Sequence, residues 1–133
     1  MFELSSLKLS PTSALHLRHP VTDVPLYADE DKKAKPVVAN LYGKASKQYR
    51  EALHTLQNKR LTQKNRKETA ENLESDNVEF LTACTKSIDN LTVEGKAADT
   101  LEVIRQLYSE AGYSWVKEQV DQHLGENSSF LKS

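Results

Sequence analysis

Apolar and polar positions alternate over short stretches near the start of the chain. Residues 14–18 and residues 37–42 show this alternation, which is typical of half-buried strands. Residues 24–27 form a third strand candidate, and Pro25 would place it at a sheet edge because proline donates no ladder hydrogen bond. The pattern therefore predicts a small sheet within residues 14–42.

Further along, apolar residues recur every three or four positions, which predicts helices. We expect helices over residues 46–63, 68–88, 99–112 and 114–125. Ser46 is a candidate N-cap, because its hydroxyl can accept from the free N–H groups of a first helical turn. Gly43, just before it, permits a tight reversal of the chain. Asp99 and Glu102 have the spacing of a capping box for the third helix.

These elements predict a mainly α-helical α+β domain with a small N-terminal β-hairpin or sheet. About four helices would pack within residues 46–125, after a flexible lead at residues 1–12 and before a tail at 126–133. A chain of 133 residues is long enough for one core and short for two, so we expect a single domain. The sequence shows no long apolar run, no signal-peptide pattern at the first residues and one cysteine, which predicts a cytosolic protein that does not span a membrane.

Charge is divided unevenly along the chain. Residues 1–67 hold thirteen Lys and Arg against six Asp and Glu, whereas residues 68–133 hold five against thirteen. The two halves can neutralise each other within one chain. Alternatively, the basic side of one copy can meet the acidic side of the next, which would give head-to-tail self-association. The sequence leaves both interpretations open.

The densest basic run lies at the end of the first predicted helix. It holds five cations and no acid, namely Lys59, Arg60, Lys64, Arg66 and Lys67. Such a run can neutralise nucleic-acid phosphates, but it lacks interleaved aromatic residues. A solvated helix end is the simpler interpretation, and an electrostatic contact face for self-association is the second.

The sequence offers no constellation that indicates catalysis. The four histidines, His16, His19, His54 and His123, do not have metal-ligand spacing. Cys84 lies among apolar residues at helical spacing, which favours a buried core thiol over a nucleophile. There is no glycine-rich phosphate loop and no nucleophile elbow. We therefore expect a protein that is not an enzyme, without a metal or cofactor.

Several aromatic residues have two possible roles. Tyr42, Tyr49 and Trp115 are amphipathic side chains that either close a thin core or form an interface. Phe130 and Leu131 form an apolar pair in an otherwise polar tail. They either dock on their own chain or insert into a neighbouring molecule.

Two segments also resemble a known family. LYGKASKQYR at residues 41–50 resembles the L-Y-G-x-x-S-x-x-Y-R core of the tail assembly chaperones of long-tailed, lambdoid (siphovirus-type) bacteriophages. WVKEQVD at residues 115–121, followed by NSSFL at 127–131, is similar to the ending of that family. The resemblance covers roughly residues 14–133.

The resemblance implies a non-catalytic protein of the host bacterial cytoplasm that is absent from the mature virion. Such chaperones coat the long, aggregation-prone tape measure protein and help to recruit the major tail protein. Many are made in a short form and in a C-terminally extended frameshift form, and this chain would be the short form. The expected partner contacts are Tyr42, Tyr49, Arg50, Trp115, Phe130 and Leu131. The alternatives are a structural component of the tail or head–tail junction and a small nucleic-acid-binding module that uses residues 59–67.

Overall fold

The computed structural model describes residues 1–29, 31–62 and 69–131. The strands are β1 (Thr12–His16), β2 (Tyr27–Asp29), β3 (Ala34–Pro36), β4 (Val38–Tyr42), β5 (Thr85–Asp89), β6 (Thr92–Val93) and β7 (Lys96–Ala97). The helices are α1 (Lys47–Thr62), α2 (Ala70–Ala83), α3 (Leu101–Ser109) and α4 (Ser114–Gly125), with 3₁₀ turns at Leu4–Leu7, Ala111–Tyr113 and Asn127–Phe130. The chain has the α+β fold that the sequence predicts, with helices and small antiparallel sheets.

The main sheet has three antiparallel strands in the order β1-β4-β5. The central strand β4 brings Ala39 opposite Leu15 on one side and opposite Ile88 on the other. Ala39 and Leu41 are buried while their neighbours on β4 are half-buried, so one face of the sheet carries the core. Two smaller hairpins, β2-β3 and β6-β7, extend from this sheet.

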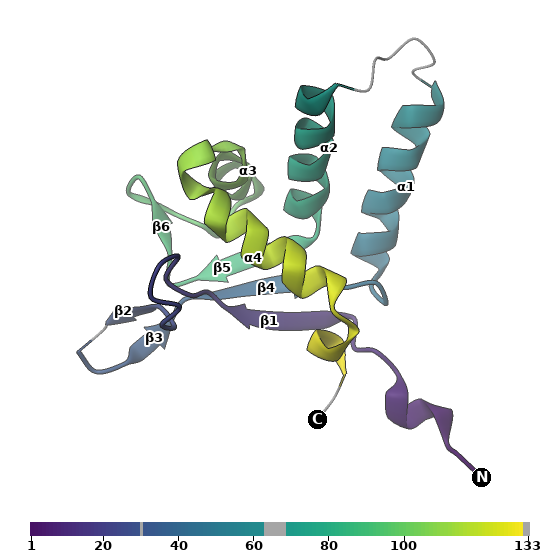
Figure 1. Ribbon diagram of the computed structural model, residues 1–133, viewed down its shortest axis with the longest axis horizontal. Coiled ribbons are helices and arrows are strands. Elements are labelled where there is room, and N and C mark those ends of the chain that lie inside the picture. Colours follow the sequence, from purple (N-terminus) through teal and green to yellow (C-terminus); the bar gives the residue numbers. More distant parts are fainter. Residues whose placement is uncertain (30, 63–68, 132–133) are drawn as a thin grey trace.

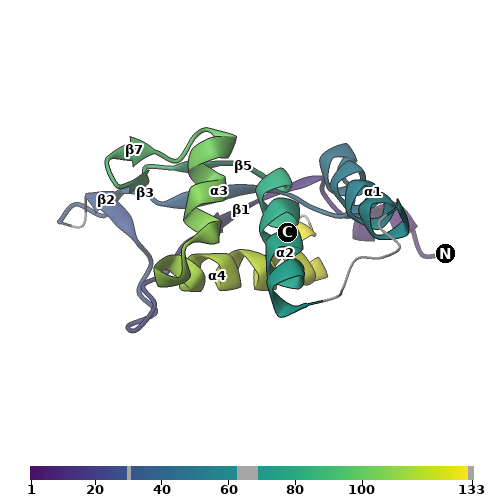
Figure 2. The same cartoon turned by 90° about the horizontal axis from the view of Figure 1, so that it is seen from above.

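Helices cover one face of the sheet (Figure 1). The view from above places α2 and α3 over the strands and α4 along the β1 side, while α1 lies beyond one end of the sheet (Figure 2). The core between these layers includes Leu81 of α2, Leu107 of α3 and Val120 of α4. We call the sheet with α2, α3 and α4 the body of the molecule. The long helix α1 packs on α2 and buries none of its side chains fully.

The largest correction to the predicted fold concerns the second helix. It was expected to continue to residue 88, but it ends at Ala83, and residues 85–89 form β5. Leu81, Cys84 and Ile88 have helical spacing, yet Ile88 also fits the buried face of a strand. Pairing with β4 decides the outcome, since Tyr42 N–H donates to Cys84 O at 2.7 Å. Residues 46–125, which were expected to be a helical region, contain the strands β5, β6 and β7 as well as helices.

The N-terminal strands also differ from the prediction. The first strand spans Thr12–His16 and pairs with β4. The expected pairing with residues 24–27 is limited to a bridge between Arg18 and Pro25, flanked by backbone hydrogen bonds from His19 N–H to Val24 O and from Leu26 N–H to Leu17 O, both at 2.9 Å. A hairpin forms later instead, between β2 and β3. The third helix begins after Thr100, whose hydroxyl accepts from Val103 N–H at 3.3 Å, and it ends at Ser109 rather than Gly112.

Candidate partner-binding surface

The two sequence segments that carry the family resemblance meet at the start of α1. The Phe130 side chain is buried, and its ring lies against Gly43. A Cβ atom at Gly43 would stand 2.6 Å from Cδ1 and 2.8 Å from Cζ of that ring. Gly43 does not adopt a positive φ. Gly43 was predicted to permit a tight turn. Its lack of a side chain instead allows the Phe130 ring to approach closely.

Backbone hydrogen bonds hold the C-terminal tail on the N-terminal segment. Ser10 N–H donates to Phe130 O at 2.7 Å, and Leu9 and Leu131 form an isolated bridge. Ser13 Oγ donates to Ser129 O at 2.7 Å. The tail therefore docks on its own chain, with Phe130 in the core and Leu131 38% exposed at the rim.

His123 belongs to the same corner. Its Nε2 lies 2.8 Å from Ser13 Oγ, and its ring lies 5.7 Å from that of Phe130. Because Ser13 gives its proton to Ser129 O, His123 Nε2–H is the donor in this pair. Burial lowers the pKa of His123, and the nearby Glu126 carboxylate acts in the opposite direction.

Ser46 caps α1 as the sequence predicts. Its Oγ accepts from Tyr49 N–H at 3.1 Å and donates to Gly43 O at 2.6 Å. The serine is buried and ties the first turn of α1 to the glycine under Phe130. The motif segment 41–50 thus fixes the direction in which α1 leaves the sheet.

The other expected contact residues lie on different elements. Tyr42 at the end of β4 and Trp115 on α4 are half-buried, and Trp115 packs against the core. Arg50 is exposed on α1. Tyr49 is half-buried and meets Phe80 of α2 edge to face, with 5.1 Å between ring centroids. Desolvation raises the pKa of Tyr49.

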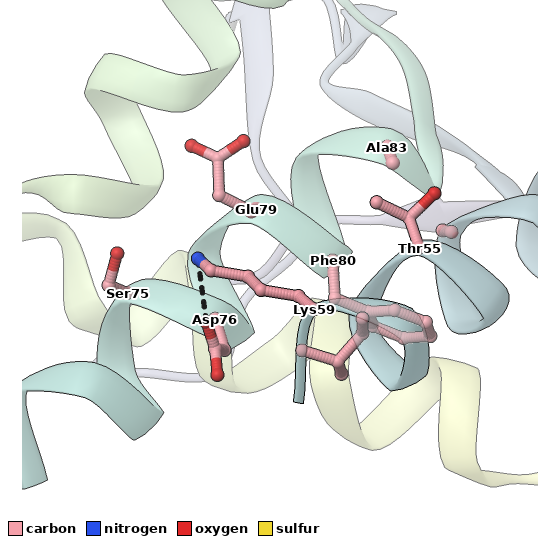
Figure 3. A pocket seen from close by; sticks show the side chains of 9 residues that line it. Thr55, Lys59, Ser75, Asp76, Glu79, Phe80 and Ala83 are labelled. Carbon is pink, nitrogen blue, oxygen red and sulfur yellow. Dashed lines mark hydrogen bonds and ion pairs between the residues drawn. The ribbon is translucent and has the colours of Figure 1, made fainter. Parts of the chain in front are cut away.

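Two grooves lie on either side of the contact between α1 and α2. The first groove, of about 470 Å³, is lined by Ala52, Thr55, Leu56, Lys59, Ser75, Asp76, Glu79, Phe80 and Ala83 (Figure 3). The second groove, of about 350 Å³, is lined by Tyr49, Leu53, Leu56, Arg60, Leu73, Asp76, Asn77 and Phe80. Leu56, Asp76 and Phe80 are shared by both. The leucines of these helices recur at helical spacing, and how far each is exposed follows from the packing of α1 against α2.

The basic run makes ion pairs within the chain. Asp76 of α2 is buried, and Lys59 Nζ lies 3.3 Å from its Oδ1 (Figure 3). Arg60 Nε lies 3.9 Å from Oδ2 of the same carboxylate. Lys59 and Arg60 belong to the basic half of the chain, and Asp76 belongs to the acidic half. At these residues the two halves neutralise each other within one chain, which was the first of the two interpretations of the charge pattern. The expected contact residues Lys64, Arg66 and Lys67 lie outside the described residues.

The remaining candidate chemistry is structural. Cys84 is fully buried, and desolvation raises the pKa of its thiol to about 12, which keeps it protonated at neutral pH. Among the described residues, no group of three His, Cys, Asp or Glu side chains is placed to hold a metal ion. Within the same residues, no helix is both long enough and apolar enough to span a membrane.

Comparison with protein-family models finds no match for this chain, and comparisons with curated proteins and with solved structures find no significant match.

Proposed function

We propose that this chain is a tail assembly chaperone of a long-tailed bacteriophage, which binds the tape measure protein, keeps it soluble and helps to recruit the major tail protein. The observation that carries the proposal is the contact between Phe130 and Gly43. Gly43 and Phe130 belong to the two segments that resemble the family, and the Phe130 ring leaves no room for a side chain at Gly43. The two segments form a single structural unit, which supports treating them as one family signature.

The second groove is the surface that fits the partner best. Tyr49, Leu53 and Leu73 face it from two helices, and Leu73 is 47% exposed. A groove between two helices, with an apolar floor and a charged rim that includes Arg60, is suited to the apolar face of an amphipathic helix. A long helical tape measure protein would offer such a face repeatedly along its length.

The direct test is co-expression with a candidate tape measure protein, followed by affinity capture and sizing at low and high salt. We expect the otherwise insoluble tape measure protein to become soluble and to co-purify with several copies of this chain. The proposal fails if the tape measure protein stays in the pellet while this chain remains soluble alone. Recovery of this chain from purified particles would instead favour a structural component of the virion.

A pair of substitutions localises the binding surface. Leu53→Glu/Leu73→Glu places charges in the second groove, and we expect it to reduce recovery of soluble tape measure protein at least tenfold. Asn58→Glu is the matched control, because this exposed residue lies on α1 outside both grooves. Circular dichroism should show the same helicity for both variants. Equal recovery with both would exclude the second groove as the binding surface.

A further inference from the structure

The first residues of the chain carry large apolar side chains that contact little of the molecule. We call Met1–Leu7 the N-terminal arm. Phe2 is 72% exposed, Leu4 is 75% exposed and Leu7 is 55% exposed. The 3₁₀ turn Leu4–Leu7 buries no side chain, although the Glu3 carboxylate accepts from Ser5 N–H at its start. A cluster of exposed apolar side chains on an ordered turn indicates a binding segment.

The root of the arm is fixed, and this sets the direction in which the arm leaves the body. Leu9 bridges Leu131, and Pro11 O accepts from Gly43 N–H at 2.8 Å. From this root the arm projects on the side of the sheet opposite to α1 and α2 (Figure 1), and the view from above shows it passing beneath α1 (Figure 2). The arm thus points away from the grooves of its own chain.

The first groove offers an apolar surface longer than one side chain. Its floor includes Ala52, Leu56 and Phe80. Beyond Ala83 it continues into a neighbouring hollow of about 420 Å³ that also holds Leu101, which is 55% exposed. Ala52, Thr55 and Ala83 line both hollows, so the two are adjacent, and we call them together the channel.

The charges in this channel fit the arm. Glu3 is the arm's charged side chain, and Lys86 is exposed at the far end of the channel. Lys86 forms no ion pair within the part of the chain that the structure describes. The channel's acids already have cations close by: Glu51 has Lys47 at 3.6 Å, Asp76 has Lys59 at 3.3 Å and Glu79 has Arg105 at 2.9 Å. The channel therefore has an available cation for Glu3.

We propose that the N-terminal arm of one copy binds in this channel of a second copy, with Phe2 and Leu4 on the apolar floor of the first groove and Glu3 beside Lys86 in the adjacent hollow. The arm and the groove are different surfaces that face opposite ways, so the contact is head-to-tail. Repetition gives a ring if the rotation closes and a filament if it does not. This goes beyond the proposed function and does not depend on it, since the isolated chain is sufficient to test it.

Disulfide cross-linking between two variants tests the contact directly. One protein carries Leu4→Cys, and a second, larger by an affinity tag, carries Thr55→Cys in the first groove. Cys84 does not compete, because it is fully buried. After mixing and mild oxidation we expect a mixed disulfide dimer, at least tenfold more abundant than with His54→Cys. That control residue is exposed on the same helix outside both grooves.

Two outcomes of the cross-linking would overturn the proposal. One is a yield of mixed dimer no higher than that of the His54→Cys control. The other is an intramolecular disulfide in a monomeric Leu4→Cys/Thr55→Cys protein at high dilution, which would show the arm folded back on its own groove.

Sizing over a range of concentrations gives an independent test. We expect Phe2→Ser/Leu4→Ser to need at least tenfold more protein for the same degree of assembly, with an unchanged circular dichroism spectrum. Val21→Ser is the matched control, because Val21 is an apolar residue that is 85% exposed outside the arm. The proposal is wrong if the unsubstituted chain stays monomeric, or if both variants assemble equally.

Discussion

Helices α1 and α3 differ in how clearly their apolar residues gather on one face, and they also differ in how far they are buried. The nine residues of α3 include four buried side chains, Val103, Ile104, Leu107 and Tyr108, whereas the sixteen residues of α1 include none. Tyr49, Leu53 and Leu56 recur on α1 three or four residues apart among many polar residues, and they remain half-buried. The weaker apolar face of α1 accords with its lower burial, and the three-dimensional packing decides what covers that face.

This contrast assigns stability to the body of the molecule and partner binding to α1. The body supplies the continuous core, and its helices are held from several sides. The α1 helix depends on its Ser46 cap, its own backbone hydrogen bonds and a one-sided contact with α2. Short helices without tertiary support are marginal in water, so α1 is expected to be the less stable region and to gain most from a partner.

The largest effect should come from leucine truncation in the body. Leu107→Ala removes a side chain that is 2% exposed, and we expect it to lower the free energy of unfolding by about 2–5 kcal/mol. The same change at half-buried Leu53 should cost about 1 kcal/mol or less. Urea denaturation followed by circular dichroism measures both. Equal losses would remove the distinction between the two regions.

The next largest effect lies where α1 joins the body. Gly43→Ala forces a methyl group against the Phe130 ring, and we expect a loss of about 1–3 kcal/mol of unfolding free energy. In a Phe130→Ala background the same change should cost almost nothing, because the clash is gone. A double-mutant cycle of unfolding free energies checks this. If the free-energy losses of the two substitutions simply add, Gly43 is needed for the backbone conformation and not for the close approach of the Phe130 ring.

A smaller effect is expected from single hydroxyl groups. Tyr108 Oη lies 2.8 Å from Thr85 Oγ1 in the core, and Thr85 also donates to Leu81 O at 2.7 Å. Tyr108→Phe should therefore cost about 1 kcal/mol of unfolding free energy. Tyr49→Phe should leave stability nearly unchanged, since the Tyr49 hydroxyl forms no hydrogen bond within the described residues. Thermal or urea unfolding of the two variants provides the comparison, and a larger loss for Tyr49→Phe would reverse it.

The smallest effect concerns pH and the docked tail. Burial lowers the pKa of His123, so the folded chain binds this proton less readily than the unfolded chain does. As pH falls below about 6.5, the unfolded state takes up the proton first and the free energy of unfolding decreases. Urea titrations at several pH values should show this decrease in the natural sequence and a weaker one in His123→Gln. An identical pH profile for the two proteins would count against the buried, neutral histidine.

Local signals in the sequence predicted several elements correctly, and contacts between distant residues explain the rest. The Ser46 cap, the strand ending at Tyr42 and the helix Ser114–Gly125 were predicted, because caps and periodicity are local. Strand β5 was missed, because its identity depends on pairing with β4. The role of Gly43 was predicted wrongly, because nothing nearby in the sequence indicates that Phe130 returns to it.

The candidate binding surface was predictable only in part. Tyr49 was among the expected contact residues and does line the second groove, whereas half-buried Leu53 and exposed Leu73, which line it as well, were not among them. Phe130 was left between two roles and turned out to be buried by its own chain. Single-sequence patterns record apolarity, and exposure follows only from how the elements pack.

Hydrogen–deuterium exchange tests most directly whether α1 is a helix kept available for a partner. The measurement compares the chain alone with its complex with the tape measure protein. We expect the amides of α1 to exchange much faster than those of α3 and α4 in the free chain, and to become the most strongly protected in the complex. Exchange in α1 as slow as in α3, and unchanged on binding, would show that α1 is an ordinary structural helix and would contradict its role as the binding element.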